Sequence, residues 1–207
     1  MEDSVFISDL HLYPSRPETI DLFLRFADEV ASTADILYIL GDFLEVWVGD
    51  DGPAGTVSSV FDKLSELKET HGTNVRLMHG NRDFMIGEDL AARCHFELID
   101  DPYAVILKGQ DALLMHGDTL FTDDVEYQAM RKVIRTPQWK QQMLEKTLEE
   151  RIAIAKSYRE QSQQSTTEKE EYIMDVNQGE TDRVFIDNDV DLIIHGHTHR
   201  PAIHRKD

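Results

Sequence analysis

The sequence predicts an α/β protein with two packed sheets. In the first half of the chain, short apolar runs alternate with segments whose apolar residues recur every three or four positions. That alternation is typical of parallel strands covered by helices. Two strand-like runs further along flank a Lys-Gly-Gln-Asp turn and indicate a hairpin. A hairpin does not fit one doubly wound sheet, so we expect a second sheet packed on the first.

The first half contains three pairs of strand and helix. In chain order we expect a strand at 5–7, a helix at 18–31, a strand at 36–40, a helix at 56–70, a strand at 75–78 and a short helix at 86–94. Residues 36–40 are five apolar residues in a row, which indicates a buried central strand.

The second half adds the hairpin, a helical stretch and a last strand. The hairpin strands are expected at 103–107 and 112–115, and the last strand at 190–194. Residues 124–172 have a helical pattern interrupted by Pro137, and the polar segment 161–168 could be a flexible link between helices. The apolar residues of this stretch have no evident place in a small α/β core, so we expect a helical cap.

Composition narrows the class of protein. The 207 residues carry a net charge of −19, which argues against general nucleic-acid binding. The exception is 125–172, with nine basic residues against eight acidic ones. This segment could receive an anionic or amphiphilic substrate, or could simply be a helical region with ordinary surface pairs. The one cysteine, Cys94, excludes an internal disulfide, and we expect a reducing compartment. No secretory signal is visible, and no apolar run approaches the roughly 20 residues of a membrane-spanning helix.

Residues of the types that commonly bind metals follow the ends of the expected strands. They are Asp9, His11, Asp42, Asn81, His116, His197 and His199. Carboxylate, imidazole and amide ligands together suit Mn²⁺, and less selectively Mg²⁺, Fe²⁺ or Zn²⁺. Seven ligands exceed what one ion needs and suit two ions about 3.5–4 Å apart that share a carboxylate. We expect Asp42 to be that carboxylate. A lone Gly-Asp is more often a helix cap or turn, but five such blocks, each after an apolar run, favour a metal centre.

Nearby residues have mainly structural interpretations. We expect His195 to hold its loop, and Glu45 and Trp47 to brace the site. Asp50 and Asp51 either orient a ligand histidine or cap a loop.

The order Asp-x-His, Gly-Asp, Gly-Asn, His-Gly and Gly-His-x-His resembles the calcineurin-like metallophosphoesterases. Longer blocks are similar to the branch that acts on UDP-2,3-diacylglucosamine in bacterial lipid A biosynthesis; they are 8–12, 45–51, 80–84, 116–120, 173–177 and 195–201. The resemblance implies a four-layer αββα sandwich, with a core at 1–123 and 173–207 and a helical cap insertion at 124–172. Members of this branch continue for some tens of residues beyond the last block, whereas this sequence ends at Asp207 and appears short for the family.

The resemblance also implies a set of roles. One Mn²⁺ would be held by Asp9, His11, Asp42 and His199, and the other by Asp42, Asn81, His116 and His197. A bridging hydroxide would attack the phosphorus on the uridine side and release UMP and 2,3-diacylglucosamine 1-phosphate (lipid X). The catalytic candidates are Asp42, Asn81, Arg82 and His116. Substrate contacts would fall on Asn81, Arg82, Asp124, Ser162, Lys169 and His197, and on Thr166, where the branch more usually has asparagine.

Arg82 departs from the wider family, in which many members have a histidine after Gly-Asn that is thought to protonate the leaving group. A guanidinium stays protonated and cannot be a general acid near neutral pH, but it can hold a phosphate by two parallel hydrogen bonds. Because a leaving group of low pKa, such as a phosphate monoester, needs little protonation, Arg82 favours cleavage of a pyrophosphate over an alkyl phosphate ester. The alternative for Arg82 is a surface ion pair with Asp83.

The resemblance further implies a lipid-linked sugar nucleotide as substrate, no nucleic-acid partner, and a cytoplasmic monomer in transient, peripheral contact with the bacterial inner membrane. The alternative activity is a phosphoesterase for another nucleotide or phosphoester. A non-catalytic scaffold would have eroded ligands, and none of the seven is lost.

Overall fold

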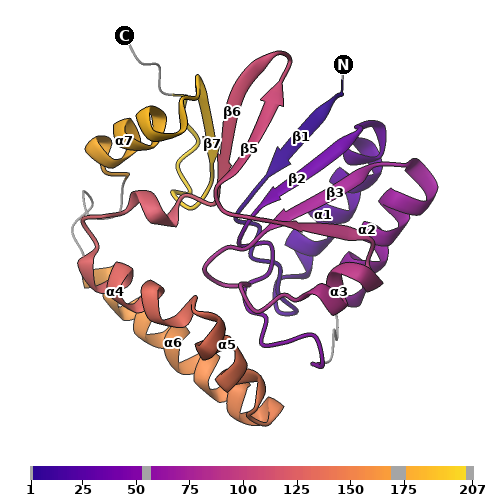
Figure 1. Ribbon diagram of the computed structural model, residues 1–207. Coiled ribbons are helices and arrows are strands. Elements are labelled where there is room, and N and C mark those ends of the chain that lie inside the picture. The colour runs from indigo at the N-terminus through magenta and orange to yellow at the C-terminus, as the bar shows by residue number, and fades with distance from the viewer. Residues whose placement is uncertain (1, 53–56, 169–175, 204–207) are drawn as a thin grey trace.

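The computed structural model describes residues 2–52, 57–168 and 176–203, and only the backbone of 161–168. Two sheets lie at its centre (Figure 1). The first has the order β1-β2-β3-β4, all parallel, with strands Ser4–Ile7, Ile36–Leu40, Asn74–Met78 and Phe96–Ile99. The second has the order β5-β6-β7, with strands Tyr103–Leu107, Gln110–Met115 and Leu192–His195. Strands β5 and β6 form the expected antiparallel hairpin, and β7 pairs parallel with β6.

Helices connect the strands. In chain order they are α1 Pro17–Glu29, α2 Ser58–His71, α3 Glu88–Arg93, α4 Val125–Ile134, α5 Pro137–Leu144, α6 Leu148–Glu168 and α7 Gln178–Asn188. None of the described helices is both long and apolar enough to cross a bilayer.

Alternation along the strands produces four layers. In β2, Leu37 and Ile39 pack into the cluster that α1 and α2 cover, whereas Ile36, Tyr38 and Leu40 face the second sheet. Successive strand residues point to opposite faces, so a wholly apolar strand is buried on both sides. In β6, Leu113 and Met115 lie in a third cluster with Val184 of α7, and Leu114 faces the first sheet. The order helix, sheet, sheet, helix confirms the expected αββα sandwich.

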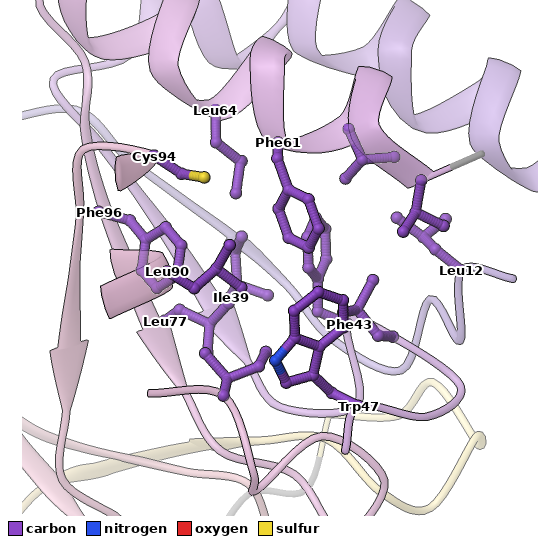
Figure 2. Packing of buried hydrophobic residues seen from close by; sticks show 14 of the residues in the cluster. Leu12, Ile39, Phe43, Trp47, Phe61, Leu64, Leu77, Leu90, Cys94 and Phe96 are labelled. Atoms are coloured by element: carbon purple, nitrogen blue, oxygen red, sulfur yellow. The ribbon is translucent and has the colours of Figure 1, made fainter. Parts of the chain in front are cut away.

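The largest cluster lies between the first sheet and its helices. Figure 2 shows Phe61 and Leu64 reaching from a helix toward Ile39, with Trp47 at the lower edge of the cluster. The Trp47 and Phe61 rings meet edge to face at 5.3 Å between centroids. Cys94 is buried in this cluster, as its sequence context indicates. The cluster holds the loop after β2 against the helices, and this loop carries Asp42 and Glu45.

Two elements were missed, and the interpretation of one segment was wrong. Strand β4 was not expected, because Glu97 interrupts the short apolar run of Phe96–Ile99. Helix α7 was missed because its apolar residues show no helical period, although Asn177 caps it by accepting a hydrogen bond from the backbone N–H of Glu180. Segment 161–168 is not a link, since α6 continues through it to Glu168. Gln, Ser and Glu have ordinary helix propensities, so polarity alone does not end a helix.

Helices α4, α5 and α6 lie side by side beyond the ends of the strands (Figure 1). Thr136 caps α5 and Pro137 occupies its first turn, which explains why the proline starts a helix here. Arg151 of α6 is buried and donates hydrogen bonds to the Val48 carbonyl (2.8 Å) and to Asp51 Oδ1 (2.7 Å). Side chains of α6 thus contact the loop after β2. The division into a core and a cap remains a prediction.

Candidate metal centre

The seven candidate ligands lie on five loops that follow β1, β2, β3, β6 and β7. The carboxyl ends of parallel strands are where ligands bind in α/β sheets. Backbone hydrogen bonds hold the loops side by side: the His11 N–H donates to the Asp42 carbonyl (2.9 Å), and the Gly196 N–H donates to the His116 carbonyl (2.9 Å). The ends of both sheets therefore meet in one region.

The structure brings all seven side chains together. Asp9, Asp42, His116 and His197 each offer one donor atom within 4.8 Å of the others, and Asp9, His11 and His199 form a second such group. Asp42 lies between the groups, with Oδ2 3.6 Å from His11 Nε2 and Oδ1 3.9 Å from His116 Nε2. The Oδ1 atom of Asn81 lies 3.1 Å from His116 Nε2. Both Asp9 and Asp42 are therefore placed to reach two ions.

Most of these ligands have an unusual backbone conformation. Asp9, His11, Asp42, His197 and His199 have φ values between 48° and 70°. This left-handed region costs a non-glycine residue roughly 1–2 kcal/mol, and such strain concentrates at functional sites. The loops thus turn tightly enough to direct side chains from separate strands toward one point.

Glycine is required beside Asp42. A Cβ on Gly80 would lie 2.1 Å from both the backbone nitrogen and Oδ1 of Asp42. A Cβ on Gly41, which has a φ of +85°, would lie 2.5 Å from His116 Nδ1. The Gly-Asp and Gly-Asn pairs of the sequence therefore allow the loops after β2 and β3 to touch.

The hydrogen bonds of His116 set its tautomer. Its Nδ1 lies 2.9 Å from the Leu40 carbonyl oxygen, to which an Nδ1–H donates, so Nε2 keeps a lone pair directed into the site. Burial alone lowers the pKa of His116, but the carboxylates of Asp42 and Asp118 outweigh this effect and raise it. Burial raises the pKa of Asp42 to about 6.

The neighbouring groups fit a bound cation. Burial and the charge of His116 lower the pKa of His197 to about 3, so this imidazole is neutral and able to coordinate. Within the described residues, Asp9 Oδ1 is buried without a hydrogen-bond partner, 3.7 Å from His199 Nε2. The other oxygen, Oδ2, accepts a hydrogen bond from the His197 N–H (2.7 Å), and a buried carboxylate oxygen without a partner is costly unless it binds a positive charge. Divalent cations would supply that charge.

Several neighbouring residues prove structural. Asp50 accepts hydrogen bonds from Trp47 Nε1 and from the backbone N–H groups of Gly87 and Leu90. It therefore caps a loop and does not orient a ligand histidine. His195 belongs to neither ligand group; its Nδ1 lies 3.0 Å from the Gly196 carbonyl oxygen.

The sequence did not indicate that Asp83 is buried. It is fully buried and accepts backbone hydrogen bonds from Phe43 (2.8 Å), Leu44 (3.3 Å) and Gly80 (2.8 Å). The alternative of a surface ion pair between Arg82 and Asp83 is therefore wrong. The only sequence signal was its position directly after Gly-Asn-Arg.

Asp118 was also missed, although it lies in the His-Gly-Asp block. It is fully buried and accepts hydrogen bonds from Tyr127 Oη (2.6 Å) and Arg131 Nε (2.8 Å). Burial raises its pKa, but His116 and Arg131 together outweigh this and lower it. Asp118 thus ties α4 to the loop that carries His116.

A cavity of about 110 Å³ adjoins the ligand loops. It lies between α4–α6 and the loops after β2 and β3. Its wall is mostly apolar, with Trp47, Phe84, Met130, Trp139, Met143 and Ile154 among its members. Asn81 and three arginines, Arg82, Arg135 and Arg159, also line it. Polar and cationic groups therefore lie next to an apolar space.

The candidate substrate contacts fall into three groups. Asn81, Arg82 and His197 lie at the ligand loops, and the Arg82 backbone N–H donates to Asp42 Oδ1 (2.8 Å). Asp124 caps α4 by accepting a hydrogen bond from the Tyr127 N–H. Ser162 and Thr166 are on α6 with side chains that are not described, and Lys169 lies outside the described residues.

A family model for calcineurin-like phosphoesterases matches residues 4–201. This chain belongs to that family. The match covers both sheets and every strand end that carries a candidate ligand.

Relatives of known name match nearly the whole chain. A UDP-2,3-diacylglucosamine hydrolase of Stenotrophomonas maltophilia is 48% identical over 97% of this chain and 84% of its own length. One of Marinobacter nauticus is 49% identical over 97% of this chain and 82% of its own length. A solved structure of a protein of unknown function from Aquifex aeolicus covers 94% of this chain and 78% of its own, with 17% identity and a TM-score of 0.45, too low to support an argument.

Proposed function

We propose that this phosphoesterase hydrolyses the pyrophosphate bond of UDP-2,3-diacylglucosamine to UMP and 2,3-diacylglucosamine 1-phosphate, a step of lipid A biosynthesis. The relatives that carry this activity in their names are nearly half identical over almost the whole chain. The structural observation that supports it most is the apolar cavity directly beside the ligand loops, with Arg82 between them. A diphosphate with a lipid tail needs both parts of such a site.

Two divalent cations would complete this site, Mn²⁺ being the expected ion and Mg²⁺ the alternative. Asp9, His11, Asp42 and His199 would hold one, and Asp42, Asn81, His116 and His197 the other. When bound, such ions supply Lewis acidity toward phosphoryl oxygens and lower the pKa of a water molecule.

Arg82 and Asn81 bind the diphosphate from the side of the cavity. The guanidinium of Arg82 offers paired N–H donors to phosphate oxygens and stabilises the charge that develops there. Because Arg82 stays protonated, it does not transfer a proton to the leaving group. The leaving sugar phosphate is already a weak base, so the reaction needs no general acid at this position.

The segment 124–172 acts as a cap that receives the acyl chains. Each methylene group that leaves water contributes on the order of 0.8 kcal/mol. The lipid substrate brings the protein, as a peripheral monomer, to the cytoplasmic face of the inner membrane. The near-neutral cap is the part best suited to that contact, because the rest of the chain is strongly acidic.

The test is a product assay. The purified protein with Mn²⁺ is incubated with UDP-2,3-diacylglucosamine in H₂¹⁸O, and products are identified by mass spectrometry. We expect UMP release, with the label in UMP because attack falls on the uridine-side phosphorus. An aryl phosphate serves as the comparison substrate. Rapid aryl phosphate hydrolysis without UMP release would reject the assignment.

Asp42→Ala tests the shared carboxylate. Loss of groups that only support a ligand costs about 10–100-fold, so removal of a ligand shared by two ions is expected to lower turnover by more than about 100-fold. The comparison is made at matched Mn²⁺ loading, with folding checked by circular dichroism. Wild-type turnover in this variant would show that Asp42 is not the bridge.

A further inference from the structure

Glu45 joins three separate segments of the chain. It lies in the loop after β2 and is 8% exposed. Its Oε2 accepts a hydrogen bond from Arg16 Nη2 (2.9 Å) and lies 3.2 Å from His11 Nδ1. Its Oε1 lies 3.0 Å from Arg159 Nε of α6. One buried carboxylate therefore contacts the loop after β1 and the helix that forms one wall of the cavity.

The two ring nitrogens of His11 face different partners. Its Nε2 points into the ligand cluster, 3.2 Å from His199 Nε2 and 3.6 Å from Asp42 Oδ2. Its Nδ1 faces Glu45. A carboxylate at the outer nitrogen of a metal-binding histidine fixes the tautomer and orientation of the ring and raises its basicity. Glu45 is placed to act in this way, since its Oε2 lies 3.2 Å from Nδ1, although in this structure the contact is an ion-pair distance and not a hydrogen bond of regular geometry.

Arg159 restrains the other oxygen of Glu45. Its guanidinium also lies over the Tyr13 ring, 5.3 Å from the centroid, and it lines the cavity beside Glu45. The Arg159 side chain thus extends from α6 to contact the loops after β1 and β2, both of which carry candidate ligands. Movement of α6 would change the position of Arg159 and, through it, that of the Glu45 carboxylate.

We propose that Glu45 is a positioning residue that orients His11 toward the metal centre, and that Arg159 links the position of α6 to this orientation. The affinity for the ion held by His11 then depends on the position of α6 relative to the ligand loops. This inference rests on the metal centre of the proposed function.

Arg151 provides a matched comparison on the same helix. Like Arg159, it joins α6 to the loop after β2, through Val48 and Asp51. Its partners do not contact any candidate ligand among the described residues. Loss of Arg151 therefore loosens α6 without touching His11. Lys156, exposed on α6, controls for the loss of one positive charge.

The experiment measures Mn²⁺ binding, by calorimetry and by electron paramagnetic resonance of free Mn²⁺, in Glu45→Gln, Arg159→Gln, Arg151→Gln and Lys156→Gln. We expect Glu45→Gln to weaken one of two Mn²⁺ sites by about 10–100-fold. Arg159→Gln should weaken the same site by less, and raised Mn²⁺ should restore its turnover. The other two variants should keep both wild-type dissociation constants.

Each contrary outcome has a distinct meaning. Wild-type Mn²⁺ constants in a folded Glu45→Gln protein would overturn the proposal. Equal weakening in Arg151→Gln and Arg159→Gln would overturn the link through Arg159, because loosening of α6 would then suffice. If Glu45→Gln does not fold, unchanged Mn²⁺ constants in Arg159→Gln still overturn that link. A wild-type protein that binds no Mn²⁺ would instead refute the metal centre of the proposed function.

Discussion

At the residue scale, the ligand loops are held by carboxylates that accept backbone N–H groups. Asp83 is bonded to the loop after β2 through Phe43 and Leu44, and to the loop after β3 through Gly80. Those loops carry Asp42 and Asn81, so one buried side chain fixes the spacing of two ligands. Such a residue need not touch substrate to be essential for the geometry.

Asp83→Ala should destabilise the protein strongly. The change leaves two or three buried N–H groups without partners, at about 1–3 kcal/mol each. We expect a loss of about 3 kcal/mol or more in the free energy of unfolding, measured by urea titration in EDTA. Asp62→Ala, at an exposed position of α2, is the control and should change it by less than about 0.5 kcal/mol. Equal effects of the two changes would contradict the role of Asp83.

At the element scale, the strands place the ligands and the loops between them supply the close approach. Gly80, two residues after the end of β3, lies directly against Asp42. Gly109, in the turn of the β5–β6 hairpin, has a φ of +86° but nothing within 4 Å of an added Cβ. A substitution at Gly80 therefore tests the effect of a steric clash, and one at Gly109 tests the effect of backbone strain alone.

Gly80→Ala should lower both stability and Mn²⁺ binding, because its Cβ would displace Asp42. Gly109→Ala should cost only the left-handed strain, roughly 1–2 kcal/mol, and leave Mn²⁺ binding unchanged. Calorimetric titration with Mn²⁺ and urea unfolding measure the two effects. Two wild-type Mn²⁺ sites in Gly80→Ala would show that the loops do not need this approach.

Helices α4–α6 allow a test of the cavity. Ala155 of α6 lines it, whereas Ala153, two residues earlier, is exposed and does not. Ala155→Trp should fill the space and raise KM for UDP-2,3-diacylglucosamine by about tenfold or more, since several buried methylene groups would be displaced. Ala153→Trp is the matched control. Hydrolysis of a small aryl phosphodiester should be equal in both variants, and equal KM values for the lipid substrate would place its acyl chains elsewhere.

At the scale of the whole molecule, the metal centre joins both sheets. Asp9 and His199 are 190 residues apart in the chain yet lie 3.7 Å from each other. An ion bound between them links the first strand to the last. Because an ion that binds only the folded state stabilises it, metal content should control global stability.

Mn²⁺ should raise the melting temperature above that in EDTA. At 100 times its dissociation constant an ion contributes about 2.7 kcal/mol, which for a chain of this size corresponds to roughly 5–10 °C. Differential scanning calorimetry at constant ionic strength measures the increase. Asp42→Ala should lose most of it, which separates site binding from general attraction of Mn²⁺ to an acidic protein.

The increase in melting temperature that Mn²⁺ causes should also depend on pH. The pKa of Asp42 is raised to about 6 and that of His116 is also raised, so both groups take up protons as the pH falls toward 5. Mn²⁺ requires their deprotonated forms. The increase should therefore be smaller at pH 5.5 than at pH 7.5. An equal increase at both values would indicate that Mn²⁺ binds elsewhere.

The local pattern of the sequence was enough to predict the fold class, the hairpin and the candidate ligands. An apolar run followed by Gly-Asp or Gly-Asn indicates a strand and the turn after it, and both can be read within a few residues. The α/β class, the hairpin and the set of seven candidate ligands follow from such runs. Segment 161–168 shows the limit, because its polar residues are as compatible with a helix as with a link.

Only the tertiary structure decided through which contacts the supporting residues hold the ligands. Nothing around Asp83 in the sequence shows that it is buried beneath two loops, and nothing near Glu45 indicates its contacts with His11 and Arg159. Those contacts join positions more than a hundred residues apart in the case of Glu45 and Arg159. They exist because packing of the two sheets and α6 brings separate segments together, whereas sequence pattern reports mainly on neighbours along the chain.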